Sequence, residues 1–553
     1  MAQIWESAVK RPYGLLAVLC LALFLQGLFT VPALDRDEAR FAQASKQMIE
    51  TGDLVDVRFQ GEPRHKKPVG IYWLQAASAS LLGAPPYDHI WPYRLPSLVG
   101  AVLAVWLTFW AGRPLVGDRA ALIGAALLAA TLMLGIEAKL AKTDAVLLAT
   151  IVAAQGALAR IALRTPPAPL SLVLVFWGAL GLGTLVKGPI AFLVIALTAV
   201  TLALWNRDRS LLTRLRPLLG FAIVAVVVLP WAVSAYLATH GQFFHDAIAG
   251  DLVPKLKGGQ ESHGAPPGTY LLLAFVTFWP GTLVLAPALV HAWGRRSDAG
   301  LRFLLAWVGP AWLVFELVPT KLPHYVLPLY PALALLCGAV VAAAESGQST
   351  PLNGLLGRLA LIAWAVVATA LAVFLAVLDP LLTKNISVVA IVLALAVLVS
   401  LVPVVQGALR GRTTRAVVAA IIVSALVQCA AFSVVAPRLT SLWVSTRVAA
   451  LLPFNPQGHH VALAASGFAE PSLVFAAGTR TVLGRPEEAV TLLASDPTAY
   501  AAIAEPQKPA FEAAARARGM APRAVATIAG FNYSVGKPVT LTLYRNGTKD
   551  SPP

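Results

Sequence analysis

Long apolar runs repeat along most of the chain, and they leave little freedom in how it can fold. A helix needs about 20 mostly apolar residues to cross a bilayer, and in lipid every backbone N–H and C=O group has to be hydrogen-bonded internally. Thirteen runs meet this description, at 14–34, 92–112, 120–136, 145–163, 169–185, 189–205, 217–236, 270–293, 301–318, 326–345, 358–380, 386–406 and 416–435. The short alternating segments of a membrane β-barrel are not seen. The chain is therefore predicted to be a polytopic α-helical membrane protein.

The composition agrees with this prediction. Hydrophobic residues make up 58% of the 553 residues and charged residues 13%, whereas soluble domains carry about 25% charged residues. Cys20, Cys337 and Cys429 all lie inside apolar runs, which is typical of small core residues and not of disulfides or metal ligands.

The positive charges predict the topology. The net charge is +16, and many of the bases lie in short loops, which the positive-inside rule places in the cytoplasm. This assignment works if the run 69–84, with the aromatic pair Tyr72-Trp73, lies along the interface as a non-spanning helix. The N-terminus is then inside and the C-terminus outside. Nucleic-acid binding is not expected, because no soluble basic patch carries interleaved aromatic residues.

The tail at 436–553 is different in character. Runs at 460–464, 472–476 and 539–544 are typical of strands, and 508–518 is typical of a helix. We expect two domains: a transmembrane domain at 1–435, with an outer loop at 35–91 that contains interfacial helices, and a small periplasmic α/β domain at 436–553.

A block of acids and bases follows the first apolar run. Asp35, Asp37, Glu38 and Arg40 are crowded where the chain leaves the membrane. Ionisable groups at a membrane are costly unless they have a function. The alternative is that Asp37 caps the helix that follows. The capping alternative accounts for one acid, so we favour a functional block.

Further charged segments fall on the same predicted outer side. Bases at 64–67 run against the positive-inside trend and suit a phosphate.

Asp144 ends the loop 137–144, where capping of the next span is an equal alternative. Lys187 interrupts a long apolar run, mostly as a helix break. The loop 237–269 is interpreted as a substrate-covering loop. The remaining candidates are His263 in that loop and Lys321, His324 and Tyr325 in the loop 319–325.

The motifs then resemble a known family. Asp37-Glu38-Ala39-Arg40, Lys67-Pro68, Arg94-Leu95-Pro96-Ser97, Thr143-Asp144, Lys187-Gly188-Pro189 and Lys321-Leu322-Pro323-His324-Tyr325 occur in the order seen in polyprenyl-phosphate-dependent GT-C glycosyltransferases. The similarity is greatest to the bacterial 4-amino-4-deoxy-L-arabinose lipid A transferases, with protein O-mannosyltransferases more distant. It covers residues 10–435.

The resemblance implies a role for each matching residue. Asp37 corresponds to the family's essential acid, and Arg40 and Lys67 to the bases that hold the phosphate of the lipid carrier. Asp144 corresponds to a second acid and Tyr325 to a tyrosine near the carrier. We predict catalytic roles for Asp37, Asp144 and Glu38, and substrate-binding roles for Arg40, Lys66, Lys67, Lys321, His324, Tyr325 and His263.

One departure from the family concerns metal binding. The arabinose transferases usually have Glu-Lys-Pro where this chain has Lys66-Lys67-Pro68, and that glutamate helps to bind a metal. A protonated lysine cannot be a ligand. The family's second metal ligand, a histidine, corresponds to a position near Asp251. We therefore expect no cofactor and no metal at this position.

The resemblance predicts an inverting glycosyltransferase of the bacterial inner membrane. The expected donor is a sugar on undecaprenyl phosphate, and the expected acceptor is lipid A, its core or another envelope glycan, met on the periplasmic face. A protein acceptor remains an alternative. A flippase of lipid-linked sugars or a non-catalytic assembly subunit would be alternatives of another class. Transporters tend to show internal repeats and midplane charges, which are not apparent here. The protein is expected to be a monomer.

Overall fold

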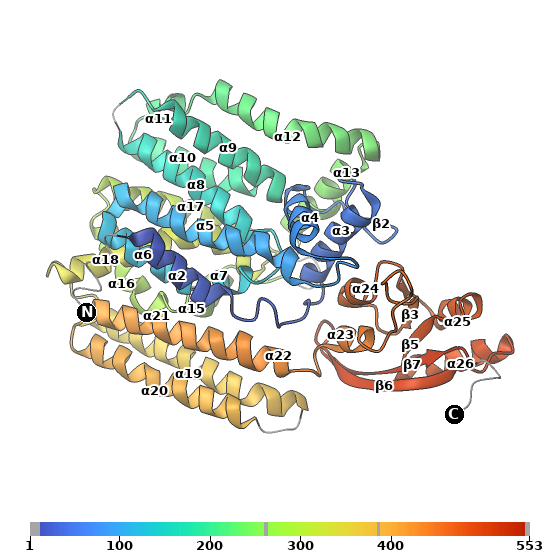
Figure 1. Ribbon diagram of the computed structural model, residues 1–553. Coiled ribbons are helices and arrows are strands. Elements are labelled where there is room, and N and C mark those ends of the chain that lie inside the picture. The colour runs from blue at the N-terminus through green and yellow to red at the C-terminus, as the bar shows by residue number, and fades with distance from the viewer. Residues whose placement is uncertain (1–10, 165, 259–263, 384–386, 548–553) are drawn as a thin grey trace.

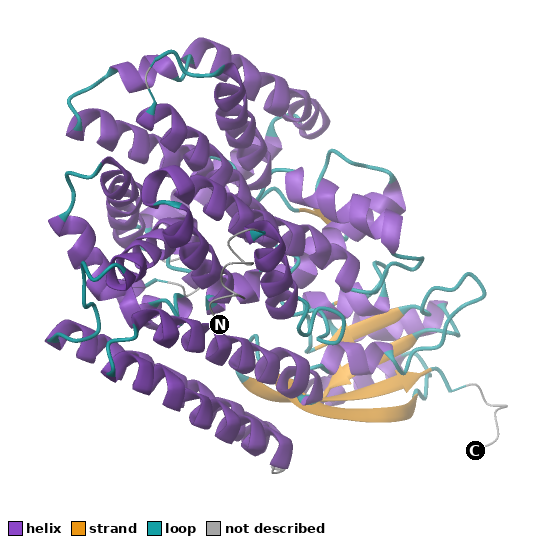
Figure 2. Ribbon diagram, turned by 60° about the vertical axis from the view of Figure 1, so that its left-hand side comes forward, coloured by secondary structure: helices purple, strands orange, loops and turns teal. Residues whose placement is uncertain are grey.

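A computed structural model describes the chain except for residues 1–10, 165, 259–263, 384–386 and 548–553. Helices form a large bundle, and a small sheet region lies at one end of it (Figure 1). Figure 2 shows the long strands gathered in this region, away from the bundle.

Each predicted apolar run contains a helix or a pair of helices. Among the described residues, nine helices are long and apolar enough to cross a membrane. The total of thirteen crossings stays a prediction. The helices of the bundle are α2 (Pro12–Phe24), α5 (Trp91–Val116), α6 (Asp118–Ala130), α7 (Leu132–Glu137), α8 (Asp144–Leu163), α9 (Leu170–Lys187), α10 (Ile190–Trp205), α11 (Ser210–Arg214), α12 (Pro217–Thr239), α15 (Thr269–Thr277), α16 (Thr282–Gly294), α17 (Ala299–Leu317), η2 (Pro323–Leu329), α18 (Tyr330–Glu345), α19 (Leu355–Thr383), α20 (Val388–Leu409) and α21 (Thr413–Cys429).

Small residues allow the central helices to approach closely. Gly124 of α6 faces the backbone of α18, where an added Cβ would lie 2.8 Å from the carbonyl oxygen of Ala334. Gly100 of α5 faces α8 in the same way, 2.8 Å from the backbone nitrogen of Val146. Such contacts hold helices together in lipid, where no hydrophobic force acts between them. The charged segments at the ends of α5, α7 and α8 are thereby held rigidly.

Two short helices lie outside the spans. They are α3 (Asp37–Thr51) and α4 (Gly70–Leu82), which pack against each other beside the bundle (Figure 1). α4 rises about 20 Å, too little to cross a hydrocarbon core of about 30 Å. This length is compatible with the predicted interfacial placement, which stays a prediction.

The C-terminal region contains a five-stranded sheet of order β4-β3-β5-β7-β6. β3 runs parallel to β4 and β5, whereas β7 runs antiparallel to β5 and β6. Successive residues of β3 alternate between two apolar clusters, one on each face of the sheet. The elements are β3 (Leu463–Ser466), α24 (Pro471–Ala477), β4 (Val482–Leu483), α25 (Pro486–Ser495), β5 (Tyr500–Ala504), α26 (Lys508–Ala517), β6 (Arg523–Asn532) and β7 (Lys537–Arg545).

One local prediction in this region is wrong. Residues 472–476 were expected to form a strand, but they belong to helix α24. Pro471 occupies the first helical turn, where its fixed φ favours a helix and its missing N–H is not needed. The helix packs on α3 and is buried there, so tertiary contact outweighs the strand-like composition. The predicted helix at 508–518 is confirmed by α26.

The segment after α2 contacts the sheet region. The backbone N–H of Asp35 donates to the hydroxyl of Tyr533 (2.7 Å), and the Arg36 guanidinium donates to the carbonyl oxygen of Ser534 (2.5 Å). The topology predicted from charge places both segments on the outer side, and this placement stays a prediction.

Candidate active site

A cavity of about 130 Å³ opens where charged segments from distant parts of the chain meet. We call it the first cavity. Its wall comes from the start of α3, the loop before α4, the loop before α8, the end of α9, the segment after α12 and the loop before α18. The lining residues are Arg36, Asp37, Arg40, Phe41, Arg64, Lys66, Lys67, Lys142, Thr143, Asp144, Lys187, Asp251, Lys255, Thr320, Leu322, His324 and Tyr325. The topology predicted from charge placed all these segments on one side.

Positive charge dominates the first cavity. Eight of its lining side chains are Arg or Lys and three are carboxylates. A concave surface with an excess of one sign concentrates ligands of the opposite sign. Arg and Lys also form the strongest hydrogen bonds to phosphate oxygens. The site is suited to an anionic phosphate group next to one or two acids.

Asp37 is placed in this cavity without a bonding partner. It is the first residue of α3, after Arg36, which has a positive φ of 64°. Arg36 occupies the N-cap position and Asp37 is an acid of the first helical turn, so Asp37 is not the capping residue. Among the described residues, the Asp37 and Arg40 side chains have no hydrogen bond or ion pair. Both remain available to a ligand.

Glu38 has a different environment from its neighbour. Both of its carboxylate oxygens bond to the guanidinium of Arg94, at 2.8 and 2.9 Å. They also accept the backbone N–H groups of Leu34 and Ala141, at 2.9 Å each. The Glu38 and Arg94 side chains are each 1% exposed, and Glu38 does not line the first cavity. Glu38 thus ties α3 to α5 and to the loop before α8, and its predicted catalytic role stays a prediction.

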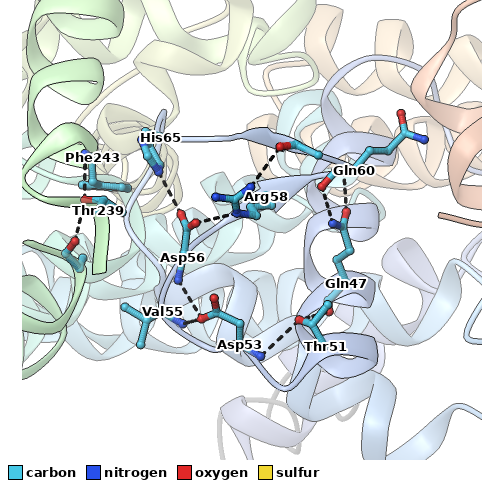
Figure 3. A network of polar contacts seen from close by, with 12 residues as sticks. Gln47, Thr51, Asp53, Val55, Asp56, Arg58, Gln60, His65, Thr239 and Phe243 are labelled. Atoms are coloured by element: carbon cyan, nitrogen blue, oxygen red, sulfur yellow. Dashed lines mark hydrogen bonds and ion pairs between the residues drawn. The ribbon is translucent and has the colours of Figure 1, made fainter. Parts of the chain in front are cut away.

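A polar network holds the loop that carries Lys66 and Lys67 (Figure 3). The Gln47 side chain of α3 donates to the carbonyl oxygen of Gln60 and accepts its N–H, at 2.8 and 2.7 Å. Asp56 accepts from Arg58 at 2.7 Å and lies 3.0 Å from Nε2 of His65. The loop includes a two-stranded ribbon, β1 (Arg58–Phe59) and β2 (Glu62–Pro63). These bonds fix the loop so that its two lysines face the cavity.

Lys67 pairs with Asp251, a residue of the segment after α12. That segment contains α13 (Gln242–His245), η1 (Asp246–Leu252) and α14 (Val253–Lys257). Nζ of Lys67 lies 2.9 Å from Asp251, and Lys255 lies 2.6 Å from the same carboxylate. Burial lowers the pKa of Lys67 to about 8, although Asp251 opposes the shift by favouring the charged form. Two cations thus share one anion, which leaves a surplus positive charge at this wall.

A second cluster gathers around Asp144, the first residue of α8. Lys187, at the end of α9, lies 2.5 Å from its carboxylate, and Nε2 of His324 lies 3.8 Å away. Thr143 occupies the N-cap position of α8, so Asp144 is not the capping residue. Glu137 bonds to Lys142 at 3.0 Å beside this cluster. The predicted helix break at Lys187 is confirmed, because α9 ends there, and the side chain also lines the first cavity.

Two predicted residues are placed elsewhere. Lys321 is buried outside the cavity wall, and its ammonium donates to the carbonyl oxygens of Glu316 and Val318 at the end of α17, at 2.7 Å each. Lys321 thus acts as a cation that donates to the last carbonyl groups of a helix. His263 lies outside the described residues. The first cavity also contains Arg64, one of the bases predicted to suit a phosphate, and Arg36, Lys142 and Lys255, which sequence reasoning did not select; their charge within predicted outer loops was the available signal.

The described residues contain no group of three or more His, Cys, Asp and Glu side chains that could hold a metal ion. Lys66 lines the first cavity, as does Asp251. A cationic side chain at this position is a poor metal ligand. The expectation that no metal binds there stays a prediction.

Comparison with known proteins gives consistent matches. Residues 66–233 match the family of dolichyl-phosphate-mannose-protein mannosyltransferases. The chain is 33% identical over 354 residues to an undecaprenyl phosphate-α-4-amino-4-deoxy-L-arabinose arabinosyl transferase of Pseudomonas aeruginosa, covering 60% of each chain. It is 31% identical to one of Pseudomonas fluorescens, covering 65% of this chain and 64% of that protein. The matches therefore span about three fifths of the relatives' length.

Two solved structures share the architecture. ArnT from Cupriavidus metallidurans bound to undecaprenyl phosphate aligns with a TM-score of 0.74 at 18% identity, over 98% of both chains. The archaeal oligosaccharyltransferase AglB from Archaeoglobus fulgidus aligns with a TM-score of 0.54 at 14% identity, over 100% of this chain and 75% of that one. The chain thus shares the fold of these two membrane proteins. Its sequence is similar to the 4-amino-4-deoxy-L-arabinose transferases over three fifths of its length, which supports the resemblance noted from the motifs.

Proposed function

We propose that the protein is an inverting glycosyltransferase that moves a sugar from undecaprenyl phosphate to a cell-envelope acceptor. The observation that carries the proposal is the first cavity, in which Asp37 lies unbonded among eight Arg and Lys side chains. The chemistry named for the arabinosyl transferases and the carrier bound to ArnT support the same donor class. No nucleotide sugar is needed.

In this proposal the donor phosphate binds to the cationic side of the cavity. Arg40 offers a planar fork of N–H groups to two phosphate oxygens, and Lys66 and Lys67 add ammonium donors. As the bond from the anomeric carbon to the phosphate oxygen breaks, negative charge grows on the leaving phosphate. Cations already in place stabilise that charge without reorganisation.

The acceptor attacks the anomeric carbon from the face opposite to the phosphate. A new carbon–oxygen bond forms, and the configuration at that carbon inverts. If the acceptor is a hydroxyl, Asp37 takes its proton; if the acceptor is an ionised phosphate, Asp37 orients it. Asp144, Lys187 and His324 form the wall that positions the acceptor. Undecaprenyl phosphate leaves with the electron pair of the broken bond.

Lipid A or its core, met on the periplasmic side, is the acceptor that the proposal favours. The protein is then a monomer with a cytoplasmic N-terminus and a periplasmic C-terminus. A protein acceptor or another envelope glycan is the alternative within the enzyme class. A lipid-linked sugar flippase is favoured less, because the charges of the first cavity converge on one site at one end of the bundle.

The test uses purified full-length protein with undecaprenyl-phosphate sugars and lipid A. Asp37→Asn keeps the size of the side chain but removes the base, and transfer to a hydroxyl is expected to fall about 10² to 10⁴-fold. Glu62→Gln is the matched control, because Glu62 is exposed on β2 and does not line the first cavity. Full transfer by Asp37→Asn would refute the catalytic assignment. A wild-type protein that transfers none of the lipid-linked sugars would refute the proposed function.

A further inference from the structure

A second cavity, of about 890 Å³, lies on the other side of α3. It is bounded by the C-terminal half of α3, the loop before α5 and the sheet region. The volume lies at the upper end of the range of about 300 to 1,000 Å³ usual for ligand pockets. Its polar and aromatic lining residues are Lys46, Glu50, Tyr87, Asp88, Asn455, Gln457, His459, His460, Thr479, Arg480, Thr481, Asp496 and Thr498.

Both cavities share α3 as a wall. Asp37 lines the first cavity and Lys46 the second. Nine residues separate them, which is two and a half turns at about 3.6 residues per turn, so they point to opposite faces of the helix. Arg40 and Lys46 are separated by about 9 Å along the axis. A ligand that filled the second cavity would therefore lie one helix away from the proposed reaction site.

Lys46 is the least expected residue in this wall. It is 2% exposed, and its ammonium makes one long bond, at 3.4 Å, to the carbonyl oxygen of Phe475. Burial lowers the pKa of Lys46, while Glu50 and Asp88 act in the opposite direction. An ammonium has three N–H donors, and a buried cation is costly unless it is bonded. Acceptor atoms of a ligand in the cavity would complete its bonds.

The remaining wall suits sugars better than a polyanion. Carboxylates of Glu50, Asp88 and Asp496 nearly balance the two strong bases, in contrast to the first cavity. Hydroxyl and amide side chains, which like sugar hydroxyls can both donate and accept, fill much of the rest. Tyr87 supplies an aromatic face and has a φ of 60°. Such backbone strain in a non-glycine residue clusters at binding sites.

We propose that the second cavity binds the oligosaccharide part of the acceptor, with Lys46, Asp88 and Tyr87 as its main contacts. This inference rests on the proposed function, because only a transferase has an acceptor. The binding of an oligosaccharide to the second cavity does not itself require transfer. The first cavity then holds the donor phosphate and the reacting sugar, and the second holds the glycan that marks the acceptor. The C-terminal region, which supplies half of the wall, becomes a specificity element.

Binding is tested on the full-length protein in nanodiscs. The probes are delipidated core oligosaccharide, a muropeptide disaccharide and inorganic phosphate, each followed by saturation-transfer NMR and calorimetry. At least one of the two sugars is expected to bind the wild type, and Lys46→Met and Asp88→Asn are expected to weaken that binding at least tenfold. Inorganic phosphate is expected not to compete. Thermal unfolding of the isosteric Asp88→Asn variant separates lost contacts from lost folding.

Kinetics separates this inference from the proposed function. If transfer occurs, both variants are expected to raise KM for the acceptor while kcat and the affinity for undecaprenyl phosphate stay unchanged. Equal sugar binding by wild type and variants, or no binding of either sugar, would overturn the second-cavity site even where transfer is intact. Sugar binding that depends on Lys46 in a protein that transfers nothing would support the site and refute the proposed function.

Discussion

The titration of Lys67 provides the sharpest test of the carrier-binding site. The pKa of its ammonium is lowered to about 8, with burial as the main cause. A sugar–phosphate–lipid diester keeps one negative charge throughout the neutral and alkaline range, so the enzyme is the partner that titrates. A phosphate beside Lys67 favours the charged form and raises its pKa in the complex. Donor affinity is therefore complete below pH 8 and is lost as the pH rises above it.

The loss of donor affinity at a given pH follows from the midpoint of the Lys67 titration. At pH 9 about a tenth of free Lys67 remains charged, which predicts about a tenfold weaker donor affinity, or about 1.4 kcal/mol per pH unit. Asp251→Asn removes the carboxylate that favours the charged form, so the midpoint moves below 8. Lys67→Arg replaces the ammonium with a group that stays charged throughout this range, so the alkaline loss disappears.

The assay is the Kd of the donor in nanodiscs from pH 6.5 to 10, by fluorescence or calorimetry. Lys66→Arg is the control, because it alters the neighbouring base and leaves the Lys67–Asp251 pair in place. The midpoint is expected near 8 in the wild type and this control. If Lys67→Arg kept the same alkaline loss as the wild type, Lys67 would not be the titrating contact and the assignment would fail.

Three further changes test other parts of the site. Glu38→Gln leaves Arg94 as an uncompensated buried charge and is expected to lower the free energy of unfolding by about 3 to 5 kcal/mol. The variant is expected to show a lower Tm but unchanged donor binding at low temperature. Tyr533→Phe leaves the Asp35 N–H without its acceptor, at a cost of about 1 to 3 kcal/mol. Hydrogen exchange of the Asp35 amide is therefore expected to be at least about fivefold faster. Unchanged exchange would contradict the contact. Lys187→Met is expected to reduce transfer at least tenfold, with Lys187→Arg retaining most of it; equal losses would mean that charge is not what this position supplies.

The site could be predicted from the sequence at the level of segments but not of side chains. Charge sorting placed the segments around Asp37, Lys67, Asp144 and His324 on one side, because basic loops and membrane crossings obey simple rules. Whether Asp37 or Glu38 faces the cavity depends on the rotation of α3. Adjacent helical residues differ by about 100°, and that rotation is set by packing against elements far away in the chain.

The same limit applies to two other segments. Lys187 ends α9, so hydropathy alone describes it as an interruption of an apolar run, and its contact with a carboxylate from α8 is invisible until the two helices are packed. Residues 472–476 are apolar and β-branched in part, and a short buried helix has the same composition as a short buried strand. The docking of α24 on α3 decides between them.

The contact between the segment after α2 and the sheet region has a consequence for how the protein is made. Asp35 and Arg36, which lead directly into Asp37, are held by Tyr533 and Ser534, nearly five hundred residues later. The ribosome therefore synthesises Asp35 and Arg36 long before their partners. The start of α3 therefore stays without its partners until every helix between has been inserted and the sheet region has folded on the correct side. An incompletely synthesised or misinserted chain would lack these contacts. The first cavity can therefore assemble only after the C-terminal region has been synthesised and folded.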